Sequence, residues 1–327
     1  MPQPSYEYAG ARIASLERRI LGRSDVMRMA EGSLMDAMRM LLDIRYGGIT
    51  DATASDVEQM IANELNAACI EIRELSPAPQ TTNLLFLHND MQNLKQLIKA
   101  RLLNQSDIEW QHGGLYTKEQ LTYCVQNADY KLFPVVIRTA LDRLEKQLQI
   151  SVEPQRISID IDAAYLEYAL EQTKKNDFLQ HYFKAMADFD NLLTFLRMRA
   201  MGAAKELFDD VMLPEGGIGH IDLLNAYELS FDAINRLMSQ SVCKDAIIEG
   251  LNRMQQTGSI GEIEKSRDNY LLSLFTKHKH ERTTLYPIIG YYLAKEREAK
   301  AVRLIITVKR NGLKDDVIVG RLVELYG

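Results

Sequence analysis

Apolar residues recur every three or four positions along most of this chain, which is the spacing that places them on one side of a helix. One such stripe consists of Leu84, Leu87, Met91, Leu94, Ile98 and Leu102. Another, interrupted once by a charged residue, consists of Ile289, Tyr292, Glu296, Ala299, Val302 and Ile306. The alternation typical of strands is rare. The sequence therefore predicts an all-α protein.

Helix starts are predicted where Ser or Thr is followed three positions later by Glu or Gln, because the two side chains can cap each other's backbone amides. Three pairs fit: Ser55 with Glu58, Thr117 with Gln120, and Ser259 with Glu262. The expected helices cover 6–22, 24–44, 55–75, 82–103, 117–127, 130–149, 160–176, 178–201, 242–256, 259–277, 286–310 and 314–325. Segment 155–162 alternates polar and apolar residues but has no partner strand, so we expect an extended linker there.

Two short patterns alternate three times along the chain. The first comprises Gly32-Ser33-Leu34, Gly113-Gly114-Leu115 and Gly216-Gly217-Ile218. The second is an acidic residue followed three positions later by Asn or a small residue: Asp90 with Asn93, Asp188 with Asn191, and Glu298 with Ala301. Their order predicts a single domain of three pseudo-repeated helical units, near 24–104, 105–201 and 202–310 after an N-terminal helix 6–22, arranged as a funnel or socket.

The composition narrows the class of protein. A hydrophobic fraction of 46% with 26% charged residues indicates a folded soluble chain, and a net charge of -6 argues against a nucleic-acid-binding protein. Cys69, Cys124 and Cys243 are widely spaced, which favours a reducing cytoplasm over a disulfide framework. No apolar run approaches the ~20 residues of a membrane span, and the N-terminus lacks a signal-peptide plan. Any membrane association is therefore expected through partner subunits.

Several segments resemble, in order, the landmarks of the C subunit of V/A-type rotary ATPases, whose eukaryotic homologue is the d subunit. They are Tyr6-x-Tyr8-x-x-Ala11-Arg12-Ile13, Tyr46-Gly47-Gly48, Leu87-His88-Asn89-Asp90-Met91-Gln92-Asn93-Leu94-Lys95, Phe189-Asp190-Asn191-Leu192, and Lys295-Glu296-Arg297-Glu298-Ala299-Lys300-Ala301-Val302-Arg303-Leu304. The resemblance runs from the first predicted helix almost to the last. One departure is Ala301, where the family commonly has Asn.

The resemblance implies a helical funnel that sits on the proteolipid (c/K) ring at the cytoplasmic face of the membrane and receives the D and F shaft subunits. Such a chain carries torque in proton or sodium transport, binds no nucleotide or other cofactor, and performs no catalysis. The length without extensions suggests the bacterial or archaeal form.

Candidate catalytic residues are few. There is no phosphate-binding G-x-x-x-x-G-K-[ST] loop, and no H-E-x-x-H or G-x-S-x-G pattern. His278 and His280 point to different faces of a helix, so a basic loop is favoured over a zinc site. Asp90 with Asn93, and Asp188 with Asn191, would share a helix face. Because the pair recurs, together with the acidic Glu298, we favour bonding to the backbone of a neighbouring loop over acid catalysis.

Candidate interface positions are the glycine pairs and the basic helix starts: Arg18, Arg19, Gly47, Gly48, Gly113, Gly114, Gly216 and Gly217. Paired glycines usually supply the positive φ of a turn, although they can also cradle an anion or touch a partner. The basic clusters are expected to be solvated helix faces, or else to meet acidic loops or lipid headgroups. They are Arg18-Arg19 with Arg23, and Lys295, Arg297, Lys300 and Arg303.

Two other functions stay open from the residues alone. The same helices and repeats fit a helical scaffold protein unrelated to an ATPase. A hydrolase using Asp90, Asp188 or the His278 region is the third reading, and it requires a cleft with perturbed carboxylates or histidines.

Overall fold

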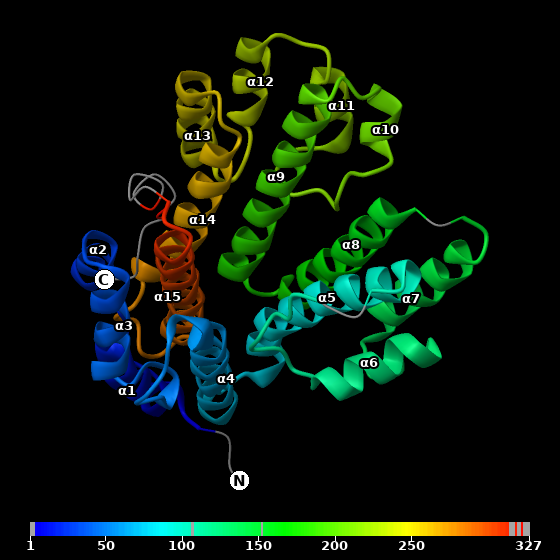
Figure 1. Ribbon diagram of the computed structural model, residues 1–327. Helices are drawn as coiled ribbons and strands as arrows, with labels where there is room; N and C mark the ends of the chain where they lie inside the picture. Colours follow the sequence, from blue (N-terminus) through cyan, green and yellow to red (C-terminus); the bar gives the residue numbers. More distant parts are fainter. Residues whose placement is uncertain (1–3, 106–107, 152, 314–317, 319–321, 323–327) are drawn as a thin grey trace. The chain divides into compact units, whose positions relative to one another are not determined.

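The computed structural model describes residues 4–105, 108–151, 153–313, 318 and 322, and over these residues it contains helices and connecting loops but no strand (Figure 1). This confirms the all-α prediction. The longer helices are α1 (Tyr6–Leu16), α2 (Arg23–Glu31), α3 (Leu34–Asp43), α4 (Val57–Leu75), α5 (Pro79–Leu103), α6 (Lys118–Asn127), α7 (Val135–Leu148), α8 (Pro154–Thr173), α9 (Asp177–Ala200), α13 (Lys244–Thr257), α14 (Gly261–Thr276) and α15 (Tyr286–Arg310). The short ones are η1 (Glu17–Arg19), η2 (Tyr46–Gly48), η3 (Ala54–Asp56), α10 (Lys205–Asp209), α11 (His220–Ala226) and α12 (Phe231–Met238).

The chain divides into two compact units. Unit 1 consists of 1–86, 112–114 and 272–327, and unit 2 consists of 87–111 and 115–271. The chain passes from one unit to the other inside α5 and again inside α14. The division into three pseudo-repeats stays a prediction.

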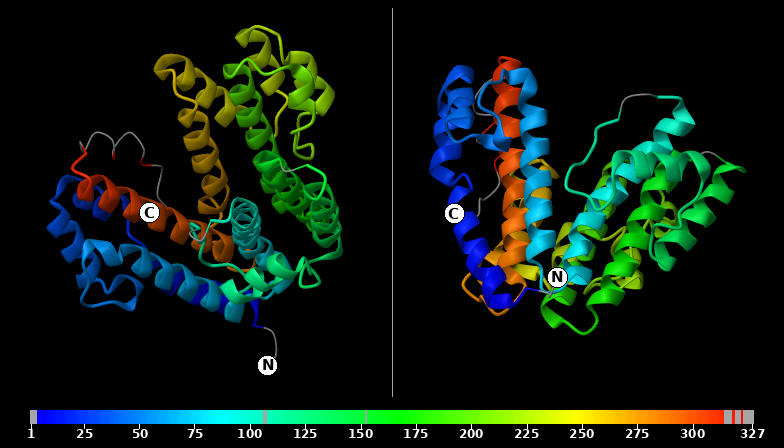
Figure 2. Two further views of the ribbon diagram at one scale, coloured as in Figure 1. Left: turned by 45° about the vertical axis from the view of Figure 1, so that its right-hand side comes forward. Right: turned by 90° about the horizontal axis from the view of Figure 1, so that it is seen from below.

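Helix α15 forms the centre of unit 1. It lies beside α4 and contacts α1, α2 and α3, so that helices from both ends of the chain share one core (Figure 2). Val302, Ile305 and Ile306 of α15 pack in the same cluster as Leu41 of α3 and Met60 of α4. Because α15 is surrounded on most sides, even several of its charged residues are buried.

Unit 2 is built on the neighbouring helices α7, α8 and α9. Aromatic residues form part of its core. Phe195 of α9 meets Phe208 edge-on at a ring distance of 5.4 Å, and Phe208 stacks on Tyr227 at 5.2 Å. Such pairs contribute about 0.5–1.5 kcal/mol each beyond their buried area.

The expected extended linker at 155–162 is wrong, because α8 begins at Pro154 and runs through it. Proline is well tolerated in the first turn of a helix, because the amide hydrogen that it lacks would have no hydrogen-bond partner within the helix there. Ile157 and Ile161 are both buried, and at i,i+4 they share one helix face. The alternation of Ile residues concealed this helical spacing.

The other differences concern helix ends and short helices. The expected helix 24–44 is divided at Gly32-Ser33, where Ser33 and Asp36 cap the start of α3. The capping box of Thr117 and Gln120 is confirmed, whereas the box predicted at Ser55 is formed by Thr53 and Asp56 instead. Helices α10, α11 and α12 were not predicted. The expected helix 314–325 lies almost wholly outside the described residues.

Candidate functional site

Asp90 and Asn93 of α5 hold the loop that follows their helix. Asp90, with 0% of its surface exposed, accepts hydrogen bonds from the amides of Leu115 at 2.8 Å and Tyr116 at 3.3 Å. Asn93 bonds both backbone groups of Gln111, each at 2.8 Å. The backbone-bonding prediction is confirmed for this pair.

Asp188 and Asn191 of α9 do the same in a second loop. Asp188 accepts from the amides of Gly217 at 2.8 Å and Ile218 at 3.1 Å, and from the hydroxyl of Ser241 at 2.5 Å. Asn191 bonds both backbone groups of Leu213 at 2.8 and 3.2 Å. Burial raises the pKa of Asp188, although Ser241 and the amides oppose that shift. The repeated spacing of Asp and Asn therefore reflects the same kind of contact between a helix and a loop in two places.

Glu298 of α15 is the third acidic position, and its loop comes from the start of the chain. Its Oε2 accepts from the amide of Leu21 at 2.6 Å. Gly32, which the sequence analysis placed in the first repeat with Asp90, also lies beside α15, because its carbonyl oxygen accepts from the Lys309 ammonium at 2.5 Å. Ala301 takes the place of Asn and packs in the hydrophobic core, so it makes no comparable side-chain bond.

A buried network of charges surrounds Glu298. Lys295 donates to Glu298 at 2.9 Å and to Glu64 of α4 at 2.7 Å. Glu64 also accepts from the amide of Gly47 at 2.9 Å. Burial disfavours the charged form of Lys295, but Glu298 and Glu64 outweigh it and raise its pKa. Burial raises the pKa of Glu298 and, together with the two carboxylates, that of Tyr46.

The expectation of a solvated basic face on α15 is therefore wrong for two residues. Lys295 is 1% exposed and Arg297 is 7% exposed. Lys300 is exposed as expected, and Arg303 is half-buried in an ion pair with Glu58 at 2.8 Å. The charged residues of this segment suggested a solvent-facing helix, although α15 is enclosed by other helices on most sides.

Glycine is required in these pairs for two different structural reasons. Gly47, Gly48 and Gly113 have φ values of 62°, 73° and 80°, which confirms the turn interpretation for them. Gly216 has no such φ; a Cβ there would lie 2.3 Å from Oδ1 of Asp188. Gly217 is similar, with Asp188 Oδ2 at 3.0 Å. These two glycines let the loop approach the buried carboxylate.

The remaining interface candidates are Gly114 and two arginines near the N-terminus, Arg18 and Arg19. Gly114 follows Gly113 without a positive φ, and its carbonyl oxygen accepts from the thiol of Cys69 at 3.7 Å. Arg18 and Arg19 lie in η1, and with Arg23 at the start of α2 they are exposed. Exposure of these three arginines fits both a solvated helix face and a surface that meets a partner.

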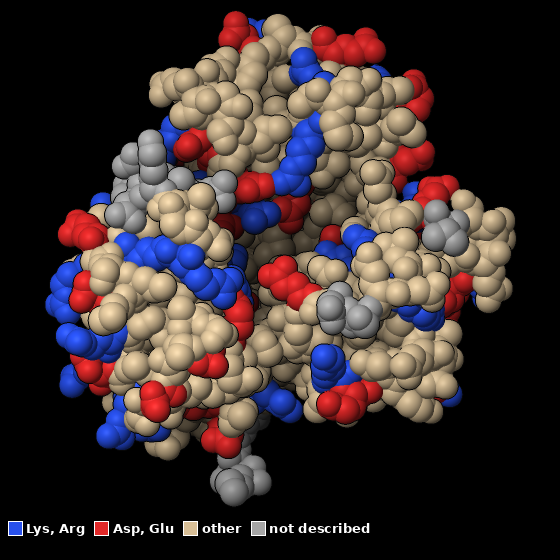
Figure 3. Space-filling model, viewed as in Figure 1, with Lys and Arg blue, Asp and Glu red and all other residues tan. Residues whose placement is uncertain are grey.

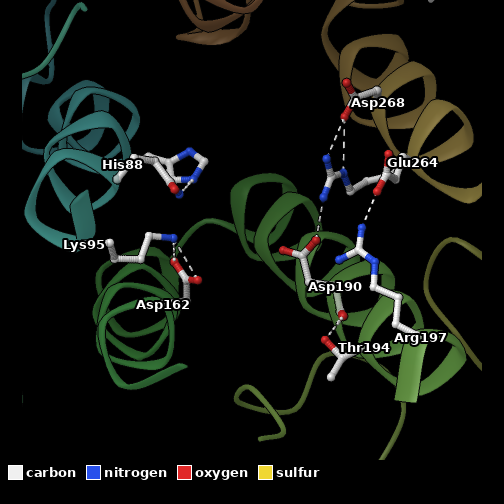
Figure 4. Close-up of polar contacts among 10 residues, drawn as sticks. His88, Lys95, Asp162, Asp190, Thr194, Arg197, Glu264 and Asp268 are labelled. Carbon is white, nitrogen blue, oxygen red and sulfur yellow. Dashed lines mark hydrogen bonds and ion pairs between the residues drawn. The ribbon is translucent and has the colours of Figure 1, made fainter. Parts of the chain in front are cut away.

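Unit 2 also contains ion pairs that sequence reasoning missed (Figure 4). Lys95 of α5 pairs with Asp162 of α8 at 2.7 Å. Arg267 of α14 pairs with Asp190 of α9 at 2.7 Å, and Arg197 pairs with Glu264 on the same two helices. Their partners are 67 to 77 positions away in the sequence, so local spacing gives no signal for them.

Several histidines of the described residues are bonded within the protein. No three of the described His, Cys, Asp and Glu side chains are grouped as a metal would require. His278 bonds Glu281 at 2.5 Å, His181 bonds Tyr270 at 2.7 Å, and His220 bonds a backbone carbonyl. The three cysteines are buried and unbridged. What the buried carboxylates do is fix loops to long helices.

None of the helices over the described residues combines the length and apolar character needed to cross a lipid bilayer.

Comparisons with known proteins agree on one family. The model of the ATP synthase (C/AC39) subunit matches residues 9–321. The C subunit of the A-type ATP synthase of Thermococcus onnurineus is 24% identical, with 98% of this chain and 90% of the relative covered. The corresponding protein of Methanocaldococcus jannaschii is 26% identical, covering 98% and 86%. The C subunit of the V-type sodium ATPase of Enterococcus hirae is 20% identical, covering 98% and 99%. This chain therefore belongs to the ATP synthase (C/AC39) subunit family of A/V-type ATPases.

Proposed function

We propose that this protein is a non-catalytic central-stalk subunit of a V/A-type rotary ATPase. It couples the membrane proteolipid ring to the D and F shaft subunits, at the cytoplasmic face of the membrane, and reaches the membrane only through these partners. The single observation that carries the proposal is the family match over 9–321, which covers nearly the whole chain.

The use of the buried polar groups supports a mechanical role. The carboxyl groups of Asp90, Asp188 and Glu298 each accept hydrogen bonds from the backbone of a loop outside their own helix. Satisfied buried networks make a structure rigid and specify one arrangement. A protein that transmits torque needs such rigidity, whereas an enzyme needs carboxylates that can reach a substrate.

The names of the relatives do not give one common transported ion. One relative is named as part of a sodium ATPase, and others are named as parts of ATP synthases. Ion choice belongs to the proteolipid ring in this proposal, so the chain serves either proton or sodium transport and requires no cofactor.

Affinity purification tests the proposal directly. The tagged protein is expressed in its own host in place of the chromosomal copy, and membranes are solubilised gently. We expect the proteolipid, D and F subunits to be recovered together, and ATP-driven ion transport by membrane vesicles to be lost on deletion and restored by the tagged chain.

A matched control is the same tag on a soluble helical protein of the host. Recovery of unrelated soluble partners, with ATP-driven ion transport unchanged by deletion, would contradict the rotor role and support the alternative of a helical scaffold.

A further inference from the structure

Positively charged residues are of one kind in the first part of the sequence. The sequence before Lys95 contains arginines but no lysine, whereas Lys and Arg are about equally frequent from Lys95 onwards. These arginines are Arg12, Arg18, Arg19, Arg23, Arg28, Arg39, Arg45 and Arg73. Arginine is enriched at protein interfaces and lysine is depleted there, because a planar guanidinium pairs with a carboxylate through two hydrogen bonds.

Seven of these arginines belong to α1, η1, α2, α3 and the turn after α3, and all seven are exposed. We call the residues Arg12, Arg18, Arg19, Arg23, Arg28, Arg39 and Arg45 the arginine surface. In the part of the chain that the structure describes, none of them forms an ion pair, although Arg101, Arg267 and Arg303 do. Basic side chains gather over α1–α3 in the space-filling view, with acidic ones between them (Figure 3).

Exposed apolar residues accompany the arginines. Tyr8 is 57% exposed and lies four positions before Arg12, so both point from one face of α1. Met35 is 72% exposed and lies four positions before Arg39, so both point from one face of α3. Ile44, also exposed, precedes Arg45. Tyr, Met and Arg are the residue types that interfaces favour.

The opposite faces of these helices are fixed in the core. Ala9 and Ile13 of α1 are buried, as are Ala37 and Leu41 of α3. The arginine surface is therefore presented by helices that are already ordered, which lowers the entropic cost of binding.

The balance of charge distinguishes the kinds of partner. The first 48 residues contain seven arginines and six acidic residues, Glu7, Glu17, Asp25, Glu31, Asp36 and Asp43, so their net charge is only +1. An anionic membrane attracts net positive charge, and this segment offers little. Separate guanidinium groups among acidic neighbours suit a protein surface with individually placed carboxylates.

We propose that the arginine surface docks on an acidic surface of another protein subunit, with carboxylates facing Arg12, Arg28 and Arg39 and apolar contacts at Tyr8 and Met35. This inference rests on the proposed function, because it takes the partner to be a subunit of the same ATPase.

The test uses the full chain and the ATPase complex purified from cells that lack it. One variant carries Arg12→Gln, Arg28→Gln and Arg39→Gln, and a second carries Lys at the same positions. A matched control carries Arg143→Gln, Lys146→Gln and Lys175→Gln, which are exposed in unit 2. Helical content and the urea midpoint are compared with wild type, so that a loss of folding is recognised.

We expect the Gln variant to lose at least about tenfold in affinity for the complex, the Lys variant to lose less, and the control to bind like wild type. A photoreactive residue in place of Met35 should cross-link a subunit through an acidic segment. The same residue in place of Ile150, exposed in unit 2, should not cross-link that segment.

Other outcomes separate the two proposals. Equal binding of the Gln variant and wild type would overturn the arginine surface and leave the rotor role intact. Failure of wild type to bind the complex would overturn both. Binding of the chain to phosphatidylglycerol vesicles that is lost in the Gln variant but kept in the Lys variant would overturn the acidic-protein partner in favour of a membrane.

Discussion

The amide nitrogen of Leu21 lies 2.6 Å from Oε2 of Glu298, although 277 positions separate the two residues. Lys295 joins the same carboxylate to Glu64, so the loop before α2, helix α4 and helix α15 meet at one buried ammonium group. Removing one partner of a buried ion pair leaves an uncompensated charge, which costs more than the pair contributes.

Replacing Lys295 by Met should therefore reduce the free energy of unfolding by about 3–5 kcal/mol. The side chains are similar in length, so the loss would come from the two stranded carboxylates and not from a cavity. Urea denaturation followed by circular dichroism measures it.

The control for Lys295→Met adds Glu64→Gln and Glu298→Gln, which removes the stranded charges. This triple variant should be more stable than the single one. A single variant within about 1 kcal/mol of wild type would show that the network contributes little.

Asp90→Ala should release the loop at Leu115 and Tyr116, because the two amides lose their acceptor inside the protein. Hydrogen bonds to a charged group contribute about 1.5–3 kcal/mol each, so a loss of about 3–6 kcal/mol is expected for the two bonds. Hydrogen exchange should quicken at the Leu115 and Tyr116 amides in particular. Exchange that changes equally everywhere would contradict a local anchor, and Asp142→Ala at an exposed position is the control.

Asp188 gives a prediction for pH. Its pKa is raised by burial, so the folded protein holds this proton more tightly than the unfolded chain does. Its contribution to stability is therefore greatest below the ordinary value of 3.8 and declines as the pH rises through the folded value. Asp188→Asn keeps a carbonyl oxygen for the Gly217 and Ile218 amides but cannot titrate.

The free energies of unfolding of wild type and Asp188→Asn should accordingly differ in their pH dependence as the pH rises above 3.8, the ordinary value for this carboxyl, with wild type losing more stability. Parallel curves would show that Asp188 does not titrate differently in the two states. Asp142→Asn provides an exposed carboxyl for comparison.

Replacing Gly216 or Gly48 by alanine should destabilise the protein for a different reason in each case. In Gly216→Ala the new Cβ would meet Asp188 and the carbonyl of Lys184 at 2.3 and 2.4 Å, which forces the loop away from the carboxylate. Gly48→Ala has open space but a φ of 73°, which costs about 1–2 kcal/mol. Gly216→Ala should be the more destabilising variant in urea, and the reverse order would contradict the close approach.

The long helices could be predicted from the sequence because their stripes repeat over many turns. Helix α15 has the predicted bounds, and α9 begins one residue from its predicted start. Helices α10, α11 and α12 are 5 to 8 residues long, which is too short for a period to be recognised. In α8 the Ile residues fit alternation and helical spacing equally well.

The loop anchors could be predicted only where a pattern recurs. Asp90 and Asp188 were interpreted correctly because each is followed three positions later by Asn. The burial of Lys295 had no such signal, since its partner Glu64 is 231 positions away and charged neighbours on a helix usually indicate solvent.

The sharing of one core by α1–α4 and α15 has a consequence for how the protein is made. Synthesis starts at the N-terminus and domains usually fold as they emerge, yet unit 1 lacks its central helix until α15 is translated, after all of unit 2. Unit 2 is complete earlier. A polypeptide that stops before α15 therefore has α1–α3 without the helix on which they pack.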